Sequence, residues 1–164
     1  MSATDNLLGN ADTYANTFNK AGLPMPPGLH VAIVACMDAR VNPYGIFGLS
    51  EGDAHVIRNA GGAVTDDVIR SLAISQRLLG TEEIILVHHD DCGMRTFTDE
   101  GLHRQIQTDT GIRPSWAAEA FADPVEDVRQ SLARIDASPF LPKKHAVRGF
   151  VYDEKTGQLK EVTP

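Results

Sequence analysis

The sequence lacks the long apolar segments that are typical of membrane-spanning proteins and the excess positive charge that is typical of nucleic-acid-binding proteins. No apolar run in its 164 residues approaches the roughly 20 residues that a membrane-spanning helix needs. The N-terminus has neither a basic region nor a long apolar core, so no secretory signal is visible and we expect a cytoplasmic protein with no membrane partner. Its 15 lysines and arginines are outnumbered by 22 aspartates and glutamates, and the net charge of −7 disfavours a nucleic-acid partner.

Cysteine is also scarce, because Cys36 and Cys92 are the only two in the chain. In a cytoplasmic protein, two thiols are more often free, catalytic or metal-bound than joined in a disulfide. A single buried cysteine is usually a small core residue. Both of these, however, follow apolar segments and lie among ionisable side chains, which favours a chemical role for the pair.

Repeats and low-complexity segments are absent, and the composition, with 42% hydrophobic and 23% charged residues, is ordinary for a globular domain. A chain of this length is the size of one domain and buries roughly 70% of its unfolded surface. We therefore expect a single domain over residues 1–164, with residues 1–28 as an N-terminal arm and linker. The linker ends in a Pro/Gly-rich segment at residues 23–28. The arm can form a thinly amphipathic helix that packs on a partner subunit, or it is a loosely attached terminus.

Apolar and β-branched runs alternate with helical patterns along the rest of the chain. Strands are predicted at residues 31–35, 54–58, 83–88 and 147–152, followed by a turn at 155–157 and a last strand at 158–162. Helices are predicted at residues 65–79, within 95–108 and at 124–137, the first capped by Thr65 and ended by Gly80. This order predicts an α/β fold: a mostly parallel central sheet flanked by helices on both sides, with an N-terminal helical arm and a C-terminal strand or hairpin.

Two clusters of reactive side chains follow predicted strands, where ligand sites of parallel sheets gather. The first is Cys-Met-Asp-Ala-Arg at residues 36–40, and the second is His-His-Asp-Asp-Cys-Gly at residues 88–93. Because the ends of parallel strands can be neighbours, Cys36, Cys92 and one of the two histidines can converge. Two thiolates and an imidazole suit a zinc ion, with the fourth position left for water or another ligand.

Asp38 and Arg40 stand at alternate positions after Cys36, so in an extended segment the three side chains point to the same side. Beside a metal ion, the Asp38 carboxylate has two possible fates. It either binds the ion and closes the site, or it pairs with Arg40, which stays charged, and leaves the position to water. The alternative is a plain surface ion pair, worth ~0–1 kcal/mol.

The pattern Cys-x-Asp-x-Arg at residues 36–40, followed by His-x-x-Cys at residues 89–92, resembles the β-class carbonic anhydrases. The segment Arg-Asn-Ala-Gly-Gly at residues 58–62 also resembles the stretch between these two motifs in that family. Carbonyl sulfide hydrolases and carbon disulfide hydrolases share the fold and the zinc ligands of the family. The resemblance covers residues 31–94 closely and the remainder by length and element order.

The resemblance implies that Cys36, His89 and Cys92 hold one zinc ion per subunit, and that Asp38 and Arg40 control its fourth position. It further implies a homodimer or a dimer of dimers, in which the N-terminal arm can take part. His88 has no ligand role in the family pattern, and we expect it to pack or to form a hydrogen bond at the strand end.

The implied activity is the hydration of carbon dioxide to bicarbonate by a zinc-bound hydroxide. The alternative is a carbonyl sulfide hydrolase, which releases hydrogen sulfide and carbon dioxide from the same site. The residues also allow a structural zinc domain with Asp38 as permanent fourth ligand, and a nucleotide-binding module, against which the lack of a phosphate-binding motif argues. Since two thiolates blunt the acidity of the metal-bound water, activity is expected to favour mildly alkaline pH.

Gly61 and Gly62 precede the helix at 65–79, and a glycine-rich turn at a helix N-terminus either receives an anion such as bicarbonate or packs closely on the sheet. His88 and Met94 depart from the family pattern and affect the expected pocket wall rather than the metal. The remaining candidates are predicted as follows: His30 and His55 at strand edges, His103 and His145 exposed, and Trp116 and Phe121 as core or interface anchors.

Overall fold

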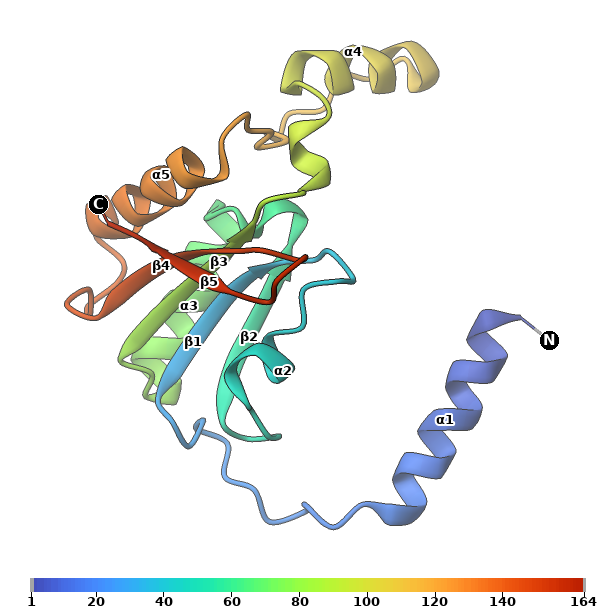
Figure 1. Ribbon diagram of the computed structural model, residues 1–164, viewed down its shortest axis with the longest axis vertical. Helices are drawn as coiled ribbons and strands as arrows, with labels where there is room; N and C mark the ends of the chain where they lie inside the picture. The colour runs from blue at the N-terminus through green and yellow to red at the C-terminus, as the bar shows by residue number, and fades with distance from the viewer. Residues whose placement is uncertain (1, 164) are drawn as a thin grey trace.

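The computed structural model describes residues 2–163 and contains a five-stranded sheet in the order β2-β1-β3-β4-β5 (Figure 1). Its strands are β1 Val31–Cys36, β2 Ala54–Asn59, β3 Glu83–His89, β4 Val147–Tyr152 and β5 Leu159–Val162. The pairing is parallel from β2 through β4, and β5 returns antiparallel to β4. The predicted α/β fold with a mostly parallel sheet and a C-terminal hairpin is therefore confirmed.

Each of the first three strands runs one residue beyond its predicted end. The additional residues are Cys36, Asn59 and His89. Because β1 and β3 are neighbours, with Ala35 opposite Val87, Cys36 and His89 end two adjacent strands at the same edge of the sheet. Cys36 and His89, which were predicted to lie just after the strands, are therefore the last residues of β1 and β3.

The two helices with clear apolar spacing lie where the sequence predicts them. α3 spans Asp66–Leu79, with Thr65 capping its first turn and Gly80 ending it in the left-handed conformation. α5 spans Pro124–Ala137, and the Asp123 side chain caps its N-terminus. Proline in the first turn suits this position, since its missing N–H has no partner there in any helix.

Two other helices differ from the prediction. α4 spans Asp99–Thr110, so it begins inside the predicted region of residues 95–108 and ends two residues beyond it. Its start follows a 3-10 turn (η2) at Gly93–Arg95, after which Thr98 caps the helix. α2, Pro43–Phe47, is not predicted by the sequence pattern. A five-residue helix is too short to show an apolar period.

Helices cover both faces of the sheet, as predicted, but unequally (Figure 1). α3 and α5 lie against one face and form the larger core with it. This core includes Val34, Val68, Leu72, Ile84, Leu86, Val128, Leu132 and Ile135. α2 covers part of the other face, where Ile46 and Phe47 pack against Ile33, Ala35 and Val87.

The N-terminal arm forms α1, Ala3–Thr17, which stands apart from the sheet (Figure 1). The helical arm is thus confirmed, yet none of its residues is buried and Leu7 is 67% exposed. Tyr14 donates a hydrogen bond to Glu51 at 3.1 Å, and Lys20, just beyond the helix, pairs with the same carboxylate. Neither α1 nor any other helix within residues 2–163 has the length and hydropathy needed to cross a membrane.

Candidate metal centre

The carboxyl ends of β1 and β3 bring three metal-binding side chains together. Cys36 is the last residue of β1, His89 is the last residue of β3, and Cys92 follows in the next loop. Their ligand atoms all lie within 4.8 Å of one another, and all three residues are buried. Two motifs that are far apart in the sequence therefore meet at one point, because their strands are adjacent in the sheet.

The imidazole of His89 has one nitrogen free for a metal ion. Nε2 is buried and has no hydrogen-bond partner among the described residues, whereas Nδ1 bonds to the Glu154 carboxylate. The sulfur atoms of Cys36 and Cys92 lie 3.9 Å apart. Two thiols and one unpartnered imidazole nitrogen form the donor set of a catalytic zinc site, which keeps a fourth position for water or substrate. The residues therefore fit a zinc ion.

The three donors shift one another's pKa values in opposite directions. The contact with Cys92 lowers the pKa of the Cys36 thiol, although burial opposes it. The same contact, together with burial, raises the pKa of the Cys92 thiol. Burial lowers the pKa of His89, but the neighbouring Cys36 thiol and the Glu154 carboxylate outweigh it and leave the pKa above its usual value. Because thiolate and neutral imidazole are the forms that bind metal, an ion entering this site displaces protons.

Asp38 and Arg40 form a two-point ion pair beside the metal donors. Arg40 Nε donates to Asp38 Oδ1 at 3.0 Å, and Nη2 donates to Oδ2 at 2.8 Å. These bonds and one from the Arg40 backbone hold the pKa of the Asp38 carboxyl well below its usual range. Asp38 Oδ2 lies 3.7 Å from Nε2 of His89, so the pair faces the donor cluster.

Asp91 holds this ion pair from the other side, a role that the sequence pattern does not reveal. Its carboxylate accepts Arg40 Nη1 at 2.7 Å, and its carbonyl accepts Nη2 at 2.8 Å. Arg40 is therefore fixed between two aspartates, and its pKa is raised by both. Asp91 lies inside the His-x-x-Cys motif, but nothing in a single sequence shows that residue 91 faces residue 40.

Arg58 holds the loop that carries the ion pair, and this role is not predicted from the sequence either. Its Nη2 donates to the carbonyls of Cys36, Asp38 and Val41 at 2.7 to 2.8 Å. Three backbone carbonyls on one guanidinium give the loop a single conformation. Arg58 belongs to the segment at residues 58–62 that resembles the family, and this was the one indication of a role in the sequence. Its hydrogen-bond partners follow only from the pairing of β1 with β2.

His88 is fully buried and lies behind the metal centre. Its Nε2 bonds to Asp127 of α5 at 2.7 Å, and its ring centre lies 5.7 Å from that of Phe121. The expectation that His88 packs or forms a hydrogen bond at the strand end is confirmed. Its partner Asp127 comes from a helix 39 residues away in sequence and was not predicted.

Gly61 and Gly62 belong to a short turn, η1 Ala60–Gly62, that packs tightly on the sheet. Gly62 has φ of +70°, and a Cβ at this position would lie 2.9 Å from the Cys36 backbone nitrogen. At Gly61, where φ is +81°, a Cβ would lie 3.1 Å from the Met94 side chain. Close packing therefore explains both glycines, and an anion-binding role for their backbone stays a prediction.

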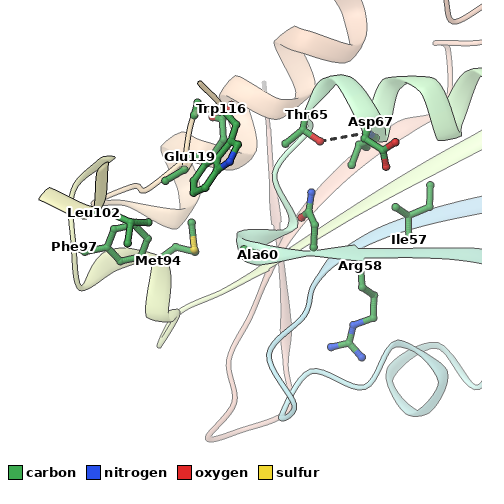
Figure 2. A pocket seen from close by; sticks show the side chains of 14 residues that line it. Ile57, Arg58, Ala60, Thr65, Asp67, Met94, Phe97, Leu102, Trp116 and Glu119 are labelled. Atoms are coloured by element: carbon green, nitrogen blue, oxygen red, sulfur yellow. Dashed lines mark hydrogen bonds between the residues drawn. The ribbon is translucent and has the colours of Figure 1, made fainter. Parts of the chain in front are cut away.

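A pocket of about 420 Å³ lies beside the metal centre, between β2, the start of α3 and the segments around α4 (Figure 2). Met94, Phe97 and Trp116 line it. Met94 and Phe97 also pack with Cys36 and Cys92, so they form a wall shared by the pocket and the metal centre. Figure 2 shows the Arg58 side chain pointing away from Trp116, in agreement with its bonds to the loop after β1.

The prediction that His103 is exposed is wrong. His103 is only 9% exposed, because α4 packs its imidazole edge-on against Trp116 with ring centres 5.4 Å apart. Trp116 itself is 54% exposed and is not a core residue. Phe121 packs against the thiol cluster, as expected of a core anchor, and His145 is exposed as predicted.

Known proteins with this sequence pattern identify the family. A profile described as carbonic anhydrase matches residues 31–136, which contain both motifs. The beta-carbonic anhydrase 1 of Mycobacterium tuberculosis (strain ATCC 25618 / H37Rv) is 63% identical over 164 residues, which is 100% of both chains. This chain belongs to the β-class carbonic anhydrase family. The predicted family and enzyme class are therefore confirmed.

Two further relatives define how this β-carbonic anhydrase compares within the family. The crystal structure of carbonic anhydrase from Streptococcus mutans has a TM-score of 0.92 at 43% identity and covers 99% of both chains. The carbon disulfide hydrolase of Acidianus sp. (strain A1-3) is 31% identical over 162 residues, 84% of this chain and 79% of that protein. The likeness to a carbonic anhydrase is thus much greater than the likeness to a hydrolase of carbon–sulfur bonds.

Proposed function

We propose that this β-carbonic anhydrase hydrates carbon dioxide to bicarbonate at one zinc ion per chain, held by Cys36, His89 and Cys92. The observation that carries the proposal is the meeting of their three ligand atoms within 4.8 Å, beside the Asp38–Arg40 pair. Zinc in such a site lowers the pKa of a water molecule and so supplies hydroxide near neutral pH. Because two thiolates neutralise the charge of the ion, turnover is expected to rise toward mildly alkaline pH.

Asp38 determines whether the fourth position is open. Both of its carboxylate oxygens accept hydrogen bonds from Arg40, which orients the carboxylate toward the guanidinium. This arrangement leaves the fourth position to water or substrate, and it supports an enzyme rather than a structural zinc domain. Asp38 Oδ2, at 3.7 Å from His89 Nε2, is also placed to accept a hydrogen bond from a water molecule among the donors.

The side chains around the thiols suit an uncharged substrate. Met94, Phe97 and Phe121 pack against the cluster that contains Cys36 and Cys92. An apolar wall receives carbon dioxide at little cost, because the molecule carries no charge to desolvate. Bicarbonate is charged and is less well accommodated there, which favours its release toward Arg40 and water.

A side-by-side turnover assay on zinc-quantified protein tests the proposal. Carbon dioxide and carbonyl sulfide are supplied in parallel at several pH values. We expect fast hydration with only trace sulfide release, and a rate that rises from acidic to alkaline pH. Strong sulfide release with feeble hydration would instead assign the site to carbonyl sulfide. Stoichiometric zinc without turnover of either substrate at any pH would indicate a structural zinc domain.

We also propose that the chain associates as a homodimer through its N-terminal arm. The support is that α1 carries exposed Leu7, Leu8 and Tyr14 and buries no residue of its own. Apolar side chains on such a helix gain free energy only when another surface covers them. Removing residues 1–22 should therefore weaken association in sedimentation experiments. A truncated chain that stays dimeric with unchanged stability would contradict this role for the arm.

A further inference from the structure

Glu154 lies in the hairpin between β4 and β5, outside both metal-binding motifs. Its side chain is 8% exposed. Oε1 accepts one hydrogen bond from ring Nδ1 of His89 and another, at 3.0 Å, from the backbone N–H of Asp91. The carboxylate thus contacts a metal-binding side chain and the loop that follows it.

The sheet and the hairpin turn determine the place of this carboxylate. β4 pairs with β3 so that Tyr152 lies opposite His89, and the chain turns two residues later. The turn is closed by its own hydrogen bonds, including one at 2.8 Å from the Gly157 N–H to the Asp153 carbonyl. Glu154 is therefore held beside His89 by an ordered backbone.

A carboxylate next to one imidazole nitrogen decides which nitrogen carries the proton. A neutral imidazole has one N–H donor and one acceptor nitrogen, and an ionised carboxylate can only accept. The bond between His89 and Glu154 therefore places the proton on Nδ1 and leaves the lone pair on Nε2. Nε2 is the buried nitrogen without a partner among the described residues, and its lone pair is what a metal ion binds.

We propose that Glu154 is a positioning residue of the metal centre, which selects the form of His89 that binds metal through Nε2. The proposal rests on the zinc site of the proposed function. The bond to the Asp91 backbone extends this role, because the Asp91 carboxylate holds Arg40 at 2.7 Å. Glu154 acts through these neighbours and touches neither substrate nor metal.

Two substitutions at Glu154 and one matched control test the role. Glu154→Leu removes both acceptor oxygens, whereas Glu154→Gln keeps one carbonyl oxygen as acceptor and removes the charge. Glu161→Gln is the control, because Glu161 lies in the same hairpin and pairs with exposed Arg148. The zinc dissociation constant is measured by competition with a chromophoric chelator. The protonated ring nitrogen of His89 is identified from long-range proton–nitrogen NMR correlations of the zinc-free protein, at a pH where the ring is neutral.

We expect Glu154→Leu to weaken zinc binding about 10–100-fold, the usual effect of losing a carboxylate that orients a metal-binding histidine. In that variant the His89 ring should populate both neutral forms. Glu154→Gln should lose clearly less zinc affinity than Glu154→Leu and keep the proton on Nδ1, since its amide oxygen still accepts. Glu161→Gln should match the unsubstituted protein in both measurements.

Each different outcome has a definite meaning. Zinc affinity in Glu154→Leu equal to that of the control would overturn the positioning role, and so would an equal loss in both Glu154 variants. If Glu154→Leu does not fold, the folded Glu154→Gln protein decides, and a proton found on Nε2 there would contradict the proposal. Failure of the unsubstituted protein to bind zinc would refute the proposed function instead.

Discussion

The metal centre and the N-terminal arm differ in how fully their side chains are bonded or packed within the chain. At the metal centre, polar groups find their partners within the chain: Arg40 bonds to Asp38 and Asp91, and Glu154 bonds to His89. In α1 no residue is buried, and the link from the arm to the rest of the chain is made by exposed polar side chains.

This difference indicates that one chain by itself fixes the geometry of the metal centre, whereas the arm depends on contact with another chain. The bond between His89 and Glu154 is buried, and buried hydrogen bonds hold a site in one arrangement before a ligand arrives. Exposed ion pairs contribute little to the free energy of folding, and apolar side chains contribute to stability only when another surface removes them from water. We therefore expect changes at the metal centre to affect chemistry and stability, and changes at the arm to affect its own order and the association of chains.

The largest effect should come from removing a metal donor. Cys92→Ser replaces a thiol with a hydroxyl, which is a poor zinc ligand, and leaves Cys36 and His89 alone at the site. Zinc-dependent hydration should fall to the background rate while the arm is unaffected. Zinc content and stopped-flow hydration measure this, with Met37→Leu at an exposed position beside Cys36 as control. Full zinc occupancy and full turnover in Cys92→Ser would falsify the three-ligand centre.

Gly62→Ala should have the next largest effect, by disturbing the backbone around the metal centre. A Cβ there would lie 2.9 Å from the Cys36 nitrogen and 3.0 Å from the Val87 carbonyl, in a residue with φ of +70°. We expect the free energy of unfolding in urea to fall by about 2–4 kcal/mol. Gly157→Ala is the control, since φ is +74° but nothing lies within 4 Å, so only backbone strain remains. An equal loss in both variants would show that the contact at Gly62 is unimportant.

Arg40→Leu should reduce kcat/KM about 10–100-fold, which corresponds to roughly 1.4–2.7 kcal/mol of transition-state free energy. The substitution leaves Asp38 without its partner and free to occupy the fourth position. Stability should change little, because the Arg40 side chain is 49% exposed. Arg104→Leu on α4 removes an equally charged but more exposed side chain and serves as the control. Unchanged kinetics in Arg40→Leu would rule out control of the site by this ion pair.

The smallest effect should come from Glu51, which ties the arm to the rest of the chain. The hydrogen bond from Lys20 lowers the pKa of Glu51 to about 2. Because this value lies below the ordinary 4.5, the stabilisation from the ionised Glu51 carboxylate is complete above about pH 4.5. It is lost as the pH falls toward 2 and the carboxylate takes up a proton. Glu51→Gln should therefore speed amide hydrogen exchange in residues 3–17 near neutral pH without changing zinc affinity. Exchange as slow as in the unsubstituted protein would show that Tyr14 and Lys20 do not order the arm.

The fold was predictable to the extent that its signals are local. Apolar runs and capping residues act over a few positions, so the helix at Pro124–Ala137 and the strand at Val147–Tyr152 have the predicted bounds. The strand ends at Cys36 and His89 were one residue off, because hydrogen bonding to neighbouring strands extends each strand beyond its apolar run. α2 was missed because five residues are too few for a period to show.

The sequence by itself determined the α/β class, the two metal-binding motifs and the family. Only the tertiary structure decided that Asp91 holds Arg40, that Glu154 bonds to His89, and that His103 is buried. Each of these depends on residues brought together by the register of the sheet or by packing between distant segments. The spacing of residues along a chain indicates which side chains share a face of one helix or strand. Hydrogen bonds between distant segments depend instead on which groups the folded backbone brings within bonding distance.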